Sequence, residues 1–186
     1  MESTDIFLPD CFGFGWTLPA IASHCGLIGF SSQKLQWRNK PFYGNDKYPF
    51  TVGLWQGIDG STIMMTHGYD YNQRFEDGDL SENKDLLELT GHSPLHMVYR
   101  YYGTGDIGGS PTFESVRAVE KGLQGNGPLQ IVSAPSERVY KDFPPYASHP
   151  EMPKFNGELL MEVHGTRWYT SQAAMKLYNR QNELLG

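Results

Sequence analysis

The chain has 186 residues and carries 15 Lys and Arg against 21 Asp and Glu, a formal net charge of −6. This length fits a single domain, and 39% hydrophobic residues are too many for a disordered chain. The acidic balance, with no block of Lys or Arg, argues against a nucleic-acid partner. No apolar run approaches the roughly 18 residues that span a bilayer.

The first third of the chain alternates short apolar segments with one helix. The helix is predicted over 17–25, with Thr17 as N-cap, Pro19 in the first turn and Gly26 as its end. A Gly/Asp turn at 57–60 separates two strands of a hairpin. The strands predicted from apolar runs are 6–8, 29–35, 51–56 and 61–66.

Charged and aromatic segments follow in the middle of the chain. A helix within 79–89 is predicted to be capped by Ser81 and to turn Leu86, Leu87 and Leu89 inward. Residues 98–102 form an aromatic strand that leads into a glycine-rich run.

The next helix is marked most clearly by its sequence. Ser110 fits the N-cap, Pro111 fits the first helical position and Gly125 ends the helix. The apolar residues predicted to line its buried face recur at helical spacing: Phe113, Val116, Val119 and Leu123.

Strands are predicted at 129–134 and 157–164, with mostly irregular chain over 135–153. A last helix, capped by Thr170 or Ser171, runs through Leu185. It places Ala174, Leu177, Tyr178 and Leu184 on one face.

This alternation of strands and helices predicts an α/β fold with a largely parallel sheet. Ligands in such folds bind at the carboxyl ends of the strands. Asp10, Asp106 and His164 each follow a predicted strand, so they are the first candidates for chemistry.

Each of these three residues also has a purely structural interpretation. Asp10 either lets a ligand approach the glycines beside it or caps a turn. Asp106, among glycines and before a helix N-terminus, suits a polar ligand or belongs to a flexible connection. His164 is a ligand or a satisfied structural histidine.

Other patterns give weaker indications. No phosphate-loop lysine follows the glycine-rich run, so a nucleotide site is not predicted. The chain contains no His-x-Asp, and Pro94 interrupts the His92/His96 pair, which argues against a metal-binding helix. Aromatic residues such as Trp55 can stack on sugar rings or fill the core, and Asp59 can bind hydroxyls or make a turn.

Several motifs, in this order, resemble the α-mannosidases of glycoside hydrolase family 38. They extend over nearly the whole chain and are specific in combination. They are LPDCFG at 8–13, FSSQKL at 30–35, PFTVGLW at 49–55, GIDGS at 57–61, GDIGG at 105–109 and YTSQ at 169–172.

The resemblance implies a zinc-dependent retaining exo-α-mannosidase with a (β/α)7-type barrel, acting on mannose-containing glycans. It implies that Asp10 is the nucleophile and a zinc ligand, and that His164 is a second zinc ligand. Asp106 is the carboxylate that matches the acid/base position. The residues expected to bind the sugar are Asp59, Trp55, Trp16 and Tyr169.

The remaining zinc ligands of the family come from a His-x-Asp motif in the first barrel strand, ahead of the nucleophile. We therefore expect residues 1–186 to form part of the catalytic barrel, without its N-terminal strand and the downstream domains. Further zinc ligands are expected upstream of residue 1, and the isolated chain is expected to be inactive.

Two alternatives stay open at this point. One is a non-catalytic carbohydrate-binding or degenerate module, and the other is an incomplete gene product without independent function. No feature of the sequence indicates an oligomeric state or a cellular compartment.

Overall fold

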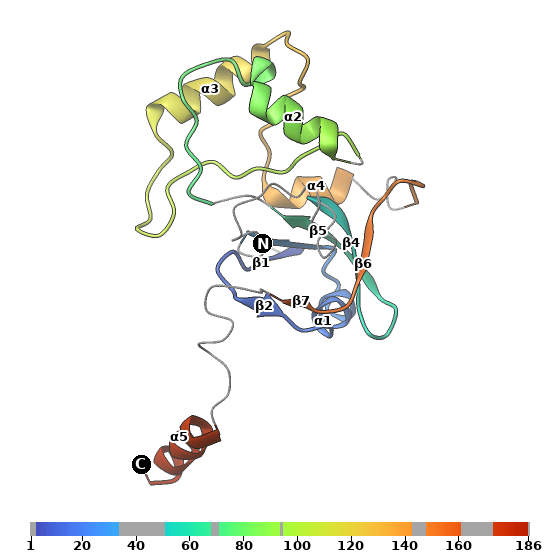
Figure 1. The fold of residues 1–186 in the computed structure, drawn as a ribbon, viewed down its shortest axis with the longest axis vertical. Coiled ribbons are helices and arrows are strands. Elements are labelled where there is room, and N and C mark those ends of the chain that lie inside the picture. Colours follow the sequence, from blue (N-terminus) through green and yellow to red (C-terminus); the bar gives the residue numbers. More distant parts are fainter. Residues whose placement is uncertain are drawn as a thin grey trace.

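The computed structural model describes residues 3–33, 51–67, 71–93, 95–142, 148–160 and 173–185. A five-stranded sheet in the order β1-β3-β5-β4-β6 lies at the centre, and β2 and β7 form a second, two-stranded sheet (Figure 1). The strands are β1 Asp5–Phe7, β2 Gly13–Phe14, β3 Gly29–Ser32, β4 Val52–Gln56, β5 Thr62–His67, β6 Lys154–Asn156 and β7 Leu159–Leu160. The helices are α1 Leu18–His24, the 3-10 helix η2 Leu80–Glu82, α2 Lys84–His92, α3 Phe113–Gln124, α4 Ser136–Asp142 and α5 Ala173–Leu185.

The five-stranded sheet is mostly parallel, as predicted. Strand β3 pairs in parallel with β1 and with β5, and β6 pairs in parallel with β4. Strand β4 is antiparallel to β5, because the turn at 57–60 joins the two directly. The described residues form a mixed α/β sheet, and closure into a (β/α)7 barrel stays a prediction.

One face of the sheet packs against α1 through an aromatic core. Trp55 and Phe30 are fully buried, with ring centroids 5.3 Å apart, and Phe14 meets Phe30 edge-on at 4.8 Å. Such edge-on pairs add to the stabilisation that burial of the rings provides. The Trp55 indole N–H donates to the Gly157 carbonyl at 2.9 Å, so its polar atom is also satisfied.

The other face packs against α4, which the sequence did not predict. Tyr140 of α4 lies over Gly29, and any side chain at position 29 would collide with its ring. The buried Tyr140 hydroxyl is 2.7 Å from the Thr66 hydroxyl. Gly29 therefore allows the close approach that lets α4 cover this face.

A third cluster lies where η2, α2 and α3 meet, away from the central sheet (Figure 1). Leu80, Leu86, Ala118 and Val119 are its buried members. The buried stripe of α3 thus differs from the predicted one, because Phe113 is 82% exposed and Val116 and Leu123 are also exposed. Val119 alone of the four predicted residues is buried there.

The positions of the strands and helices agree with the prediction in the first third of the chain and diverge later. The segments 98–102 and 129–134 are not strands, and 136–142 is a helix where irregular chain was expected. Both serine caps were wrong. Asp79 and Asn83 cap η2 and α2, and Thr112 caps α3.

These differences have local physical causes. The Ser81 hydroxyl, expected as a cap, is buried and accepts a bond from the Gly127 N–H at 3.0 Å. Leu87, expected inward, is 42% exposed, whereas Leu86 is buried in this cluster and Leu89 packs against it, as predicted. Helix α5 was correctly predicted as a helix, but it lies apart from the other elements in Figure 1 and all its described residues are exposed.

None of the helices that the structure describes is long and apolar enough to cross a membrane.

Candidate active site

The parallel strands define a carboxyl edge and an opposite edge of the central sheet. Strands β1, β3 and β5 end at Phe7, Ser32 and His67, and β4 begins beside Thr66. We call this side of the sheet the carboxyl edge. The other side, where β5 begins and β4 ends at Gln56, is the amino edge.

Asp10 lies at the carboxyl edge, in the exposed loop directly after β1. The Leu8 N–H donates to the Ser31 carbonyl at 3.0 Å, which extends the pairing of β1 with β3 beyond Phe7. The loop that carries Asp10 thus starts from a fixed point on the sheet.

Asp106 lies in a second loop that starts near the same point. The Tyr101 ring packs on Phe7, the last residue of β1, with centroids 5.4 Å apart, and the exposed Asp106 follows five residues later. The structure therefore brings the two proposed catalytic carboxylates to loops that leave the same edge.

The Asp106 loop is held by the segment that follows β5. The Gly103 N–H donates to the Gln73 carbonyl at 2.9 Å, and the Gly105 N–H donates to Asn72 Oδ1 at 3.2 Å. The Tyr71 hydroxyl donates to Asp106 Oδ1. Residues 71–73 thus contact the loop at three successive points.

Buried polar groups lie beneath this edge. His67 is 2% exposed, and burial lowers the pKa of its imidazole to about 3, so the ring is neutral at pH 7. Burial raises the pKa of the Tyr99 phenol to about 12, and the Asp5 charge adds to this effect. This edge therefore combines exposed carboxylates with a buried histidine that is neutral at pH 7.

Three of the residues expected to bind the sugar, Trp55, Trp16 and Asp59, do not lie at the carboxyl edge. Trp55 is fully buried in the aromatic core, where no sugar can reach it. The Trp16 indole donates to the Gln56 carbonyl at 3.1 Å, which places Trp16 at the amino edge.

Asp59 also lies at the amino edge, in the turn between β4 and β5. Its carboxylate accepts from the Ser61 hydroxyl at 2.7 Å and the Ser61 N–H at 2.9 Å, and it lies 3.1 Å from His24 Nε2. The bonds from Ser61 and His24 lower the pKa of the Asp59 carboxyl. These contacts agree with the turn-forming alternative for Asp59.

His164 and Tyr169 lie outside the described residues. Among the residues that are described, no group of three or more His, Cys, Asp and Glu side chains is placed to hold a metal ion. Asp10 supplies the kind of oxygen ligand that zinc accepts.

Two features of this edge were missed from the sequence. Tyr71 and Asn72 lie in a polar segment without periodicity, and nothing in it pointed to Asp106, more than 30 residues later. His67 was seen as one of several isolated histidines, although its position after an apolar strand marks it as the end of β5.

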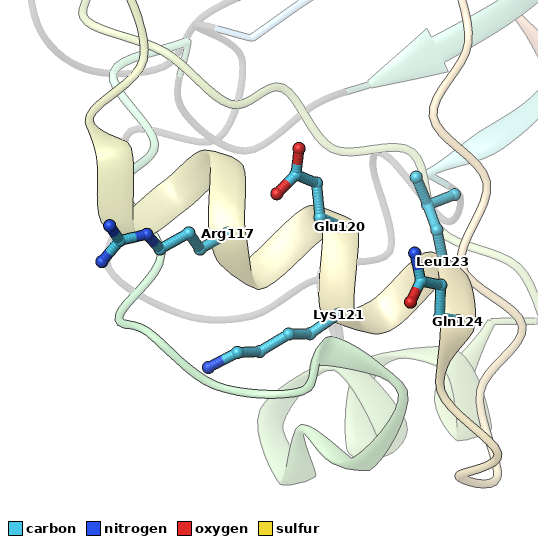
Figure 2. A pocket seen from close by; sticks show the side chains of 5 residues that line it. All are labelled: Arg117, Glu120, Lys121, Leu123 and Gln124. Atoms are coloured by element: carbon cyan, nitrogen blue, oxygen red, sulfur yellow. The ribbon is translucent and has the colours of Figure 1, made fainter.

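A shallow hollow on the outer face of α3 lies elsewhere (Figure 2). It is lined by Arg117, Glu120, Lys121, Leu123 and Gln124. None of the predicted site residues that the structure describes lines it, so it is not a candidate for the same chemistry.

Comparisons with known proteins point in one direction. The sequence profile of the glycosyl hydrolases family 38 N-terminal domain matches residues 1–149. Alpha-mannosidase G of Dictyostelium discoideum is 34% identical over 98% of this chain, and the alpha-mannosidase of Saccharomyces cerevisiae is 30% identical over 99%. The chain spans only 16% and 17% of the lengths of these two relatives.

A solved structure gives the same picture for the fold. The alpha-mannosidase from Enterococcus faecalis V583 superposes with a TM-score of 0.53 at 14% identity, over 86% of this chain and 18% of that one. At this identity the likeness concerns the fold alone.

Proposed function

The chain belongs to the glycosyl hydrolases of family 38, and from this premise we propose that it carries part of the catalytic centre of a retaining α-mannosidase. The substrate would be a glycan with terminal α-linked mannose. The observation that carries the proposal is that Asp10 and Asp106, the carboxylates matched to the nucleophile and the acid/base, follow segments that meet at the carboxyl edge.

Retention of configuration requires two carboxyl groups roughly 5–5.5 Å apart, one to attack and one to transfer a proton. In the proposed reaction Asp10 attacks the anomeric carbon and forms a covalent mannosyl-enzyme, while Asp106 donates a proton to the departing oxygen. Asp106 then takes a proton from water, which attacks the anomeric carbon and releases mannose and Asp10. Both carboxylates are exposed, so a sugar can reach each of them.

Zinc is proposed as the cofactor, with Asp10 and His164 as two of its ligands. Carboxylate oxygen and imidazole nitrogen both suit zinc. A bound zinc ion would hold sugar hydroxyls and favour distortion of the ring.

For the 186 residues as a separate polypeptide we propose weak zinc binding and no turnover. The sequence contains no His-x-Asp to complete the ligand set that the family uses. Two ligands hold zinc far less tightly than four. Tyr169 remains the proposed sugar contact, whereas the positions of Trp55, Trp16 and Asp59 favour structural roles.

Covalent trapping tests the proposal. The natural polypeptide, with any residues that flank this chain, is incubated with zinc and 2-deoxy-2-fluoro-α-mannosyl fluoride, then digested and analysed by mass spectrometry. We expect the fluoromannosyl group on Asp10. An Asp106→Ala variant is the control and should still be labelled, because fluoride leaves without a proton.

Labelling of another carboxylate would contradict the assignment of Asp10. Calorimetry with mannose distinguishes the alternative of a binding module. Mannose binding that needs no metal, together with the absence of any label, would support that alternative.

A further inference from the structure

Asp106 has an unusual backbone conformation for a residue with a side chain. Its φ is 60°, in the left-handed region that few residues other than glycine adopt. The Ile107 N–H donates to the Gly105 carbonyl at 2.7 Å, which closes a tight γ-turn around Asp106. Conformations of this kind persist only where the surroundings hold them, and they gather at functional sites.

Tyr71 is the side chain that holds this turn. Its ring lies against Gly105, where any side chain would collide with it, and its hydroxyl donates to Asp106 Oδ1. Tyr71 thereby contacts the turn twice, once at the backbone before Asp106 and once at the carboxylate itself.

The neighbours of Tyr71 support it. Asn72 Oδ1 accepts from the buried Gly105 N–H at 3.2 Å, and the Arg100 guanidinium donates to Gln73 Oε1. At the far side of the loop, the Thr104 hydroxyl donates to the Ser110 carbonyl at 3.0 Å. The loop is therefore tied on both sides of Asp106, and Tyr71 donates a hydrogen bond to the carboxylate itself.

We propose that Tyr71 is a positioning residue for Asp106: by packing on Gly105 and bonding Oδ1, it leaves Oδ2 to face the glycosidic oxygen. The inference rests on the proposed function, in which Asp106 transfers the proton. General acid catalysis depends on reach and direction, so a carboxyl group that rotates away from the leaving oxygen loses much of its effect.

The test compares two substrates in the natural polypeptide, with any residues that flank this chain. Methyl α-mannoside has a leaving group that needs a proton, and 2,4-dinitrophenyl α-mannoside has one that does not. For Tyr71→Phe we expect kcat/KM to fall by about tenfold to a hundredfold with the methyl substrate and by less than about twofold with the dinitrophenyl substrate.

Tyr102→Phe is the matched control. Tyr102 is exposed, lies in the same loop and has only a long 3.5 Å contact from its hydroxyl to Ser133. Both rates should stay unchanged in this variant. Equal losses with both substrates in Tyr71→Phe would indicate a merely structural role, and no loss with either would also overturn the proposal.

A second measurement separates this inference from the proposed function. If the wild-type protein hydrolyses neither substrate, the proposed function fails. NMR of the 186-residue chain then tests the contact between Tyr71 and Asp106 independently of activity. The Asp106 carboxyl carbon signal and the couplings that report its φ should change in Tyr71→Phe and not in Tyr102→Phe. Identical Asp106 signals in both variants would overturn the positioning role.

Discussion

The two edges of the central sheet differ in what their polar side chains do. At the amino edge, Asp59 uses its carboxylate to bind Ser61 and His24, and the Trp16 indole binds the Gln56 carbonyl. At the carboxyl edge, Asp10 is exposed in the loop after β1, and Asp106 is exposed in a loop whose Tyr101 packs on Phe7, the last residue of β1. Carboxylates from motifs of one family therefore have different roles. Asp59 stabilises a turn at the amino edge, whereas Asp10 and Asp106 are exposed at the carboxyl edge.

This contrast shows why a motif residue needs its place in the topology before it receives a role. Asp59 and Asp10 both lie beside glycines and both belong to family motifs. Only the antiparallel pairing of β4 with β5 reveals that the turn with Asp59 points to the opposite edge. Ligands in sheets of this kind bind beyond the carboxyl ends of the parallel strands.

The largest expected effect comes from replacing one carboxylate at each edge with an amide, in two separate variants. Asp10→Asn should lower kcat/KM of the natural polypeptide for an aryl α-mannoside by about 10⁴-fold or more, because an amide cannot form the glycosyl ester. Asp59→Asn, measured in the same assay, should change it by about twofold at most, as expected for a surface substitution away from the site. Comparable losses in the two variants would show that both edges take part in the reaction.

The first third of the chain was predicted well from sequence because its signals are local. Thr17, Pro19 and Gly26 mark α1, and the turn at 57–60 marks a hairpin. Gly26 does end α1, with a φ of 76°, although the Thr17 side chain makes no capping bond.

Later segments were predicted less well because tertiary contacts decide them. The apolar run 129–134 resembles a strand, yet Leu129 and Ile131 pack against the cluster around Leu80. Residues 136–142 form a helix that covers one face of the sheet, because Tyr140 buries its ring over Gly29. Neither contact can be read from residues near it in sequence.

The candidate site could likewise be predicted only where local sequence signals mark it. Asp10 and Asp106 were found through their motifs and their positions after apolar segments. Tyr71 was not, because its role depends on a contact with a loop more than 30 residues away. The positive φ of Asp106, which marks this loop as unusual, has no signature in the sequence.

A tryptophan in the core and one at the amino edge are expected to contribute different amounts to the free energy of unfolding. Trp55→Ala should lower the free energy of unfolding by about 3–5 kcal/mol, because it opens a cavity beside Phe30 and Phe14. Trp16→Ala should cost about 1–2 kcal/mol, since its ring is half-buried and makes one hydrogen bond. Urea denaturation followed by far-ultraviolet circular dichroism measures both values. Equal losses would mean that Trp16 belongs to the core as fully as Trp55 does.

The last of these effects concerns the buried histidine at the carboxyl edge and appears as a dependence of stability on pH. The pKa of His67 is about 3 in the folded chain and about 6.5 when unfolded, because burial disfavours the charged ring. Above pH 6.5 the ring is neutral in both states and contributes no pH dependence. Below pH 6.5 the unfolded chain binds the proton first, so stability falls as pH falls toward 3.

Between pH 7.5 and 4.5 this linkage amounts to about 2–3 kcal/mol, measured as the change in unfolding free energy from urea titrations. His67→Gln should reduce the slope of the unfolding free energy against pH, independently of how much it changes the stability at pH 7.5. His24→Gln, at the amino edge where the ring is 76% exposed, should keep it. A slope that disappears in His24→Gln and persists in His67→Gln would place the pH-sensitive group at the amino edge. The neutral, buried state inferred for His67 would then be wrong.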